Sequence, residues 1–419
     1  MTRILIIGNG GREQALAWKF AQDARVERIY LANGNGGTSF ISKAENIPQQ
    51  SVDALLTFAQ DYHIDLTMVG SEALLMEGIV DRFRAAGLKI FGADLQSAQL
   101  EGSKRFAKDF MAKYGVKTAA YASFSDLDAA LAHLQHCPYP TVVKASGLAA
   151  GKGVIICQNR VEAEAAVRDI MAAKRFGSAG DEIVIEEFLQ GFECSLLSFC
   201  DGKTLALMLP ARDHKTIGEH NSGANTGGMG VVAPHPLFTA AHRAAFERDI
   251  AAPTLRGLAA EGMALAGVIF FGLMITADGV YLLEYNMRLG DPETQALLPL
   301  LETELLDPIE AALRGELSAE AFQFRPQHSV CLVAAARGYP GTPETGQPIH
   351  NLEQARFFAQ IFIAGARREG EALYTSGGRV LNVVALGDDL ATARAAAYSA
   401  LEKIDFDGIT FRRDIGAED

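Results

Sequence analysis

The stretch Gly279-Val-Tyr-Leu-Leu-Glu284-Tyr-Asn286-Met-Arg288-Leu-Gly-Asp291-Pro-Glu-Thr-Gln295 decides our interpretation of the fold. Its composition predicts a strand over Val280–Tyr285, then a loop and a helix that starts at Asp291-Pro292. Because side chains alternate between the two faces of a strand, we expect Val280, Leu282, Glu284 and Asn286 on one face.

A carboxylate and an amide oxygen at the end of that strand suit a hard cation such as Mg²⁺, which completes its ligand shell with phosphate and water. Glu284 and Asn286 are therefore candidate metal ligands in a nucleotide-phosphate site. A half-buried strand that ends in a polar loop would show the same short pattern, so the rest of the chain must decide.

Length and composition narrow the choice of function. The chain has 419 residues, enough for roughly three domains, and 49% of them are hydrophobic. A net charge of −13 gives no support to nucleic-acid binding. Five cysteines without a C-x-x-C pair argue against disulfides and a zinc site. With no signal-peptide pattern or long apolar run, we expect a cytoplasmic protein without a membrane partner.

Residues 1–102 alternate strand and helix patterns, which predicts a βαβ domain with an open parallel sheet. The first turn, Gly8-Asn9-Gly10-Gly11-Arg12-Glu13, could bring backbone amides to a phosphate at a helix N-terminus. Glu13 stands where a dinucleotide fingerprint has its third glycine, which disfavours a dehydrogenase. A small phosphorylated ligand and a purely structural turn both remain open at this point.

The central segment joins two apolar runs through a glycine-rich loop. Ser103 can cap a helix over Lys104–Tyr114. Strands at 141–145 and 154–157 flank the loop Ser146–Gly153, whose spacing differs from a P-loop but whose amides and lysine suit polyphosphate. Lys144 lies inside the first apolar run, so we expect either an anionic partner or an edge strand.

Two polar clusters follow. Glu186-Glu187-Phe188-Leu189 ends a strand, and we interpret it as a hinge that could hold a purine, with Glu193 near the ribose; a solvated charge pair is the alternative. The loop His220–Gly230 is long, and long loops in compact domains are usually functional or disordered. From about residue 327 the pattern changes to a separate α+β domain that extends to residue 419.

The order of these motifs along the chain resembles that of the ATP-grasp ligases. The motifs are Lys104, Lys144, the loop Gly147–Gly153, Glu186-Glu187-x-Leu189 with Glu193, and Glu284-x-Asn286. Adding Arg288-Leu-Gly-Asp-Pro-Glu293, Asn225–Gly230 and Ile7–Glu13, the whole chain resembles the phosphoribosylamine–glycine ligase family. The resemblance implies an α/β and α+β multidomain protein: a βαβ substrate domain (1–102), an ATP-grasp domain (103–326) with a mobile lid at about 118–190, and a small α+β domain (327–419).

The resemblance implies that glycine, 5-phosphoribosylamine and ATP are joined into glycinamide ribonucleotide through glycyl phosphate. Its implied catalytic residues are Arg288, Lys144 and Asp213, and its metal ligands, for Mg²⁺ or Mn²⁺, are Glu284 and Asn286. ATP would be bound by Lys104, Lys144, Gly151, Lys152, Gly153, Glu186, Glu187, Phe188, Leu189 and Glu193. The other two substrates would be bound by Gly10, Gly11, Arg12, Glu72, Asn225, Thr226, Gly227, Gly228, Met229, Gly230 and Asp291.

Two departures from the family pattern matter. The place of a further metal carboxylate, in Phe271-Gly-Leu-Met274, is apolar, which leaves the number of metal ions open. The run Gly70-Ser71-Glu72-Ala73-Leu74-Leu75 lacks two family prolines, so its loop should be less rigid. An ATP-grasp ligase with other substrates and a nucleotide-binding regulatory protein remain alternatives. We expect a monomer, with a dimer as the alternative, and no nucleic-acid partner.

Overall fold

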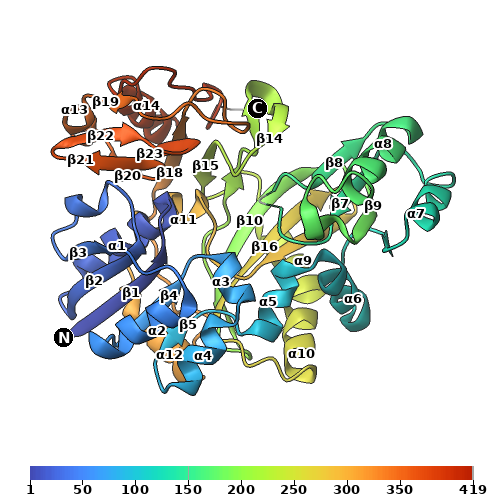
Figure 1. The fold of residues 1–419 in the computed structure, drawn as a ribbon, viewed down its shortest axis with the longest axis horizontal. Helices are drawn as coiled ribbons and strands as arrows, with labels where there is room; N and C mark the ends of the chain where they lie inside the picture. Colours follow the sequence, from blue (N-terminus) through green and yellow to red (C-terminus); the bar gives the residue numbers. More distant parts are fainter. Residues whose placement is uncertain (150, 418–419) are drawn as a thin grey trace.

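The computed structural model describes residues 1–149 and 151–417. Ala150, in the predicted glycine-rich loop, and residues 418–419, in the predicted C-terminal domain, lie outside the described residues. Figure 1 shows the N-terminal and C-terminal regions side by side, with the expected lid, at about residues 118–190, projecting on the opposite side.

The N-terminal region contains the predicted parallel sheet, with strand order β3-β2-β1-β4-β5. The strands are β1 (Thr2–Gly8), β2 (Val26–Asn33), β3 (Ala44–Ile47), β4 (Leu66–Val69) and β5 (Ile90–Phe91). The helices are α1 (Gly11–Gln22), α2 (Val52–Asp61), α3 (Glu72–Met76), α4 (Ile79–Ala85) and α5 (Leu95–Gly102). The strand order reverses between β1 and β4, and ligands of such sheets bind in the crevice beyond the strand ends at that point.

Two four-stranded sheets form the central region. One has the order β11-β10-β16-β17, from β10 (Phe192–Cys200), β11 (Leu205–Leu207), β16 (Gly267–Thr276) and β17 (Gly279–Asn286). The lid sheet has the order β6-β9-β7-β8, from β6 (Tyr121–Phe124), β7 (Thr141–Ala145), β8 (Val154–Cys157) and β9 (Ile183–Glu187). The lid buries its own apolar cluster, whereas the N-terminal sheet and the β10–β16–β17 sheet share one.

A β-bulge in β17 corrects one prediction. Gly272 pairs with Glu284 while the next residue, Leu273, pairs with Leu282, so Leu283 is an extra residue. An extra residue reverses the alternation beyond it. Val280, Leu282 and Tyr285 are buried in the core, and Glu284 and Asn286 lie on the other face. The expectation that Val280 and Leu282 share a face with Glu284 and Asn286 was therefore wrong.

The C-terminal sheet draws strands from two parts of the chain. Its order is β12-β15-β18-β23-β20, from β12 (Arg212–Asp213), β15 (Gly230–Ala233), β18 (His328–Ala335), β20 (Gln360–Ile363) and β23 (Arg379–Gly387). A smaller sheet contains β19 (Pro348–Ile349), β22 (Ala372–Thr375) and β21 (Ala366–Glu369). The larger sheet thus crosses the expected boundary between residues 326 and 327, and it attaches the C-terminal region to the centre.

The remaining elements surround these sheets. The helices are α6 (Lys104–Tyr114), α7 (Leu127–His133), α8 (Arg160–Met171), α9 (Ala240–Phe246), α10 (Ala252–Ala260), α11 (Glu293–Leu297), α12 (Leu306–Arg314), α13 (Leu352–Arg356) and α14 (Leu390–Leu401). A π-helical turn joins α9 to α10, and a small hairpin is formed by β13 (Thr216–Gly218) and β14 (Ser222–Asn225). None of the helices in the described residues is long and apolar enough to cross a membrane.

The start of α1 packs directly against the C-terminal region. A Cβ atom placed on Gly11 would lie 2.4 Å from Nδ2 of Asn382 and 2.6 Å from Nε2 of Gln295. Both neighbours are fully or almost fully buried, so neither can move away freely. Only a glycine fits this junction without displacing its neighbours.

We therefore expect Gly11→Ala to lower Tm, with a cost of about 1–3 kcal/mol for overpacking. Differential scanning calorimetry would measure the change. Gln22→Ala, at an exposed position of the same helix, is the control and should alter stability by less than about 0.5 kcal/mol. An unchanged Tm for Gly11→Ala would contradict the close contact.

Candidate active site

Two buried lysines share one buried carboxylate where the lid meets α6. Nζ of Lys144 donates to Oε2 of Glu186 at 2.9 Å, and Nζ of Lys108 lies 3.2 Å from the same oxygen. Lys108 also donates to Thr118 Oγ1 at 2.7 Å. Since β7 lies between β9 and β8, the edge-strand interpretation of Lys144 was wrong, and Glu186 is its anionic partner.

This cluster shifts the pKa values of its members. Burial lowers the pKa of Lys108 to about 8, although the charge of Glu186 opposes the change. Burial alone would raise the pKa of Glu186, but Lys144 and Lys108 lower it overall. Oε1 of Glu186 is buried and has no hydrogen-bond donor among the described residues. The cluster therefore fixes an ionised carboxylate with one acceptor oxygen unused.

Glu284 and Asn286 lie together at the end of β17, as their spacing predicts. Burial alone would raise the pKa of Glu284, but the charges of Lys104, Lys215 and Lys144, with a hydrogen bond from Asn286, lower it to about 2. Nζ of Lys215 also lies 3.0 Å from Oε2 of Glu193. The carboxylate is thus ionised, and the charges of three lysines from separate segments stabilise it.

Arg288 is held among three carboxylate or amide oxygens. Its Nη2 lies 3.1 Å from Oε1 of Glu101 and 3.3 Å from Oδ1 of Asn286. Its Nε lies 3.7 Å from Oε2 of Glu72. Glu101 also accepts the backbone N–H of Met287 at 2.7 Å, which ties α5 to the end of β17. Arg288 therefore lies between the metal candidates and the loop after β4.

Asp213 and Glu293 form a second carboxylate group on the other side of the site. Burial, followed by the negative charge of Glu293, raises the pKa of Asp213 well above its usual value. Oδ1 of Asp213 has no hydrogen-bond donor among the described residues, whereas Oε1 of Glu293 accepts from Ser195 at 2.9 Å. The ionised form of Asp213 is therefore disfavoured beside Glu293, and a cation bound there would stabilise it.

Most backbone N–H groups of the loop Asn225–Gly230 donate to acceptors within the protein, so they are not free to bind a ligand. The N–H groups of Thr226, Gly227, Gly228 and Met229 donate to Lys215 O (2.7 Å), Tyr339 Oη (2.9 Å), Thr226 Oγ1 (2.9 Å) and His214 O (2.8 Å), respectively. Gly228 has φ +110°, and a Cβ atom there would lie 2.6 Å from Oδ1 of Asp213. The loop thus supports Asp213.

A cavity of about 480 Å³ lies at the reversal point of the N-terminal sheet. Its walls include Gly10, Arg12, Glu13, Glu72 and Asp291. The cavity is therefore lined by the segments after β1, β4 and β17. Its volume is in the range of small-molecule sites. The structure therefore places four of the predicted substrate residues around one cavity.

Arg12 and Glu13 hold the walls of this cavity together. Nε of Arg12 donates to Oε1 of Glu13 at 2.5 Å, Nη1 donates to Leu289 O at 2.9 Å, and Nη2 donates to Gly70 O. Oε2 of Glu13 accepts the N–H of Gly10 at 2.7 Å. Glu13 replaces the third glycine of the fingerprint because it caps α1 and pairs with Arg12.

The other predicted nucleotide residues surround the lid. Gly151 faces the Asn225–Gly230 loop, since a Cβ atom there would lie 3.6 Å from Thr226 O. Lys152 and Glu187 are exposed, and Oε2 of Glu187 lies 3.4 Å from the backbone nitrogen of Ala120. Gly153 is buried, and Phe188 and Leu189 are half-buried in the connection from β9 to β10.

Sequence reasoning missed Glu101, Lys108, Lys215, Glu293 and Arg379. Three of them had a usable signal: Lys108 lies one helical turn after Lys104, and Lys215 and Glu293 each lie two residues after a predicted site residue, Asp213 and Asp291. The other two join the site through contacts distant in sequence. Arg379 lies 88 residues from Asp291, whose backbone carbonyl accepts its Nη1 at 2.7 Å.

The donors available to a metal are one carboxylate and one amide. Among the described residues, no three His, Cys, Asp or Glu side chains are grouped as potential metal ligands. Gly272, opposite Glu284, provides no oxygen from its side chain. An ionised carboxylate beside an amide oxygen nevertheless fits a hard cation that takes further ligands from phosphate and water.

Comparison with known proteins covers the whole chain. The N, ATP-grasp (A) and C domains of phosphoribosylglycinamide synthetase match residues 2–101, 102–294 and 329–418. The phosphoribosylamine–glycine ligases of Fusobacterium nucleatum subsp. nucleatum and Clostridium acetobutylicum are each 49% identical, over 99% of this chain and 98% and 99% of theirs.

A solved structure agrees with these sequence relatives. The crystal structure of phosphoribosylamine–glycine ligase from Thermotoga maritima has a TM-score of 0.88 and 33% identity, covering 99% of this chain and 100% of that chain. The predicted multidomain ATP-grasp fold is confirmed. The chain belongs to the phosphoribosylglycinamide synthetase family.

Proposed function

We propose that the chain is a phosphoribosylamine–glycine ligase, which joins glycine to 5-phosphoribosylamine in purine biosynthesis and converts ATP to ADP and phosphate. The full-length relatives have this activity in their names. The observation that supports it most directly is the position of Arg288, between the Glu284–Asn286 pair and Glu72 of the cavity wall. The nucleotide and amine sites would meet there.

ATP would lie between the lid and the β10–β16–β17 sheet. Lys104, Lys144 and Lys152 would neutralise its phosphates, Gly151 and Gly153 would allow the loop to cover them, and Glu187, Phe188, Leu189 and Glu193 would surround the nucleoside. The unused oxygen of Glu186 is an acceptor suited to the amino group of adenine, since a buried unpaired acceptor is costly. Mg²⁺ or Mn²⁺ on Glu284 and Asn286 would neutralise phosphate charge when bound.

Glycine would bind beside Asp213 and Glu293, because its ammonium group would add positive charge where burial and Glu293 disfavour the ionised form of Asp213. The loop residues Asn225, Thr226, Gly227, Gly228, Met229 and Gly230 would hold Asp213 in place. Phosphoribosylamine would occupy the cavity beside Gly10, Gly11, Arg12, Glu72 and Asp291. Arg12 has three N–H groups paired with protein acceptors, so at most two of its five N–H groups remain for a ligand.

The reaction needs two displacements. A carboxylate oxygen of glycine attacks the γ-phosphorus of ATP, the bond to ADP breaks, and glycyl phosphate forms. The amine nitrogen of phosphoribosylamine then attacks the glycyl carbonyl, phosphate leaves, and the nitrogen loses one proton. Arg288 and Lys144 would stabilise charge on the transferred group, and alignment contributes most of the rate.

We also propose that the domains meet at 102/103 and 326/327 and that the lid, at about 118–190, is mobile. A lid would keep water from the acyl phosphate. The separate apolar core of the lid supports its movement as a unit. We further propose a monomeric, cytoplasmic enzyme, with a dimer as the alternative.

Phosphate release measured with ATP, Mg²⁺, glycine and freshly prepared phosphoribosylamine tests the proposed function. We expect turnover with all components, loss of product when glycine or the amine is omitted, and loss of more than about 100-fold in kcat for Glu284→Ala. Glu77→Ala, at an exposed position on α3's C-terminal side, is the control and should keep wild-type turnover.

Replacement of glycine by another amino acid without loss of rate would instead indicate a ligase with other substrates. Nucleotide binding without turnover would indicate a regulatory protein. Wild-type turnover by Glu284→Ala would refute the metal assignment.

The lowered pKa of Lys108 predicts how the stability of the protein depends on pH. Its pKa is about 8 in the folded protein and 10.5 in the absence of burial, so between these values the unfolded chain binds more protons. Stability therefore rises with pH in this window. We expect urea denaturation between pH 7.5 and 10.5 to show wild type gaining stability relative to Lys108→Met. Lys113→Met, at an exposed lysine of the same helix, should show no such gain. A flat difference for Lys108→Met would contradict the shift.

A further inference from the structure

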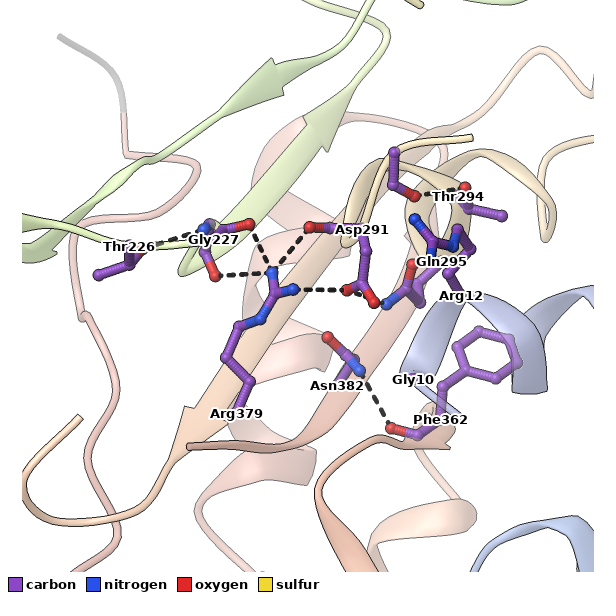
Figure 2. A network of polar contacts seen from close by, with 12 residues as sticks. Gly10, Arg12, Thr226, Gly227, Asp291, Thr294, Gln295, Phe362, Arg379 and Asn382 are labelled. Atoms are coloured by element: carbon purple, nitrogen blue, oxygen red, sulfur yellow. Dashed lines mark hydrogen bonds and ion pairs between the residues drawn. The ribbon is translucent and has the colours of Figure 1, made fainter. Parts of the chain in front are cut away.

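Arg379, at the start of β23, extends from the C-terminal region into the active site. Figure 2 shows its guanidinium between the Thr226–Gly227 loop and Asp291. Nη1 donates to the carbonyls of Gly227, of Gly228 at 3.4 Å and of Asp291 at 2.7 Å, and Nη2 lies 3.3 Å from Oδ1 of Asp291. The side chain is 20% exposed, so the group is largely removed from water.

On one side, Arg379 determines the place of Asp291. The Asp291 carboxylate also accepts from Nε2 of Gln295 at 2.9 Å. A Cβ atom on Gly10 would lie 2.9 Å from its Oδ2. Asp291 therefore lines the cavity next to the first turn of α1. Arg379 contacts both its backbone carbonyl and its carboxylate.

On the other side, Arg379 contacts the loop that packs against Asp213. Its Nη1 donates to the carbonyl of Gly227 and lies 3.4 Å from the carbonyl of Gly228. Gly228 in turn packs against Oδ1 of Asp213, where no larger side chain fits. Movement of the Gly227–Gly228 peptide would thus move the support of the Asp213–Glu293 pair.

The same cation also acts on the charge of both carboxylates. Burial would raise the pKa of Asp291, but Arg379 and Arg12 lower it overall. Burial and Glu293 raise the pKa of Asp213, while Lys215 and Arg379 oppose the rise. One positive charge therefore favours the ionised form of Asp291 on one side and limits the rise in the pKa of Asp213 on the other.

We propose that Arg379 is a positioning residue for glycine and phosphoribosylamine, because one planar guanidinium fixes Asp291 at the amine cavity and Gly228 beneath Asp213. This inference rests on the proposed function. In the part of the chain that the structure describes, the hydrogen bonds and the ion pair of the Arg379 guanidinium involve none of the proposed nucleotide residues. It should therefore govern the two small substrates and leave nucleotide affinity unchanged.

Arg379→Lys is the decisive variant. It keeps the positive charge but loses the fork that reaches several acceptors at once. Arg394→Lys is the matched control, since Arg394 also holds two carbonyls, Ile415 O at 3.1 Å and Arg413 O at 2.7 Å, in the same region of the chain. Arg379→Gln removes the charge as well.

Steady-state kinetics would give KM for each substrate, calorimetry would give Kd for Mg²⁺–ADP, and thermal unfolding would give Tm. For Arg379→Lys we expect KM for glycine and for phosphoribosylamine to rise about tenfold or more, because small displacements of positioning groups have large effects. Kd for Mg²⁺–ADP should stay within about twofold, and Arg394→Lys should leave both KM values unchanged. Arg379→Gln should give a larger rise than Arg379→Lys.

A lower Tm with unchanged KM values in Arg379→Lys would show that Arg379 is only a structural contact and would overturn the proposal. Equal weakening of glycine, amine and ADP would overturn it too, because the effect would then not be confined to the two sites. Absence of glycine-dependent phosphate release in the wild type would instead reject the proposed function.

Discussion

The structure depends on the pairing of charges that have been removed from water. A buried ion without a partner costs several kcal/mol, so each buried carboxylate here needs a cation close by. Glu186 has Lys144 and Lys108, Glu284 has the field of three lysines, and Asp291 has Arg379. Beside Glu293 the ionised form of Asp213 is disfavoured, and the ammonium group of the proposed substrate glycine would stabilise it.

The close approach of these charged groups requires glycine at two positions, Gly11 and Gly228. Buried charges from distant segments can meet only if the backbones that hold them approach closely. Gly11 allows α1 to touch Asn382 and Gln295, and Gly228 allows its loop to touch Asp213. A methyl group at either place would separate elements whose polar groups are already matched, so small residues lie where the three regions meet.

Much of the fold could be predicted from the sequence, because periodicity and turn residues are local signals. The parallel sheet and the Glu284-x-Asn286 strand are examples. The bulge at Leu283 could not be predicted, since it depends on pairing with β16 and leaves local propensity unchanged. The entry of β12 and β15 into the C-terminal sheet is likewise a long-range pairing. Arg379 and Glu101 lack a local signal because their partners lie far away in sequence.

Lys108 pairs with a carboxylate of the lid sheet although it belongs to a helix outside that sheet. It belongs to α6, whose apolar residues pack in the core shared with the N-terminal sheet, whereas Glu186 and Lys144 belong to the lid sheet. A polyphosphate that attracts Lys144 would weaken one of the two ion pairs of Glu186. The second pair would remain, because Lys108 is also held by Thr118. Glu186 could then stay ionised and in place while Lys144 changed partners, which a single lysine could not achieve.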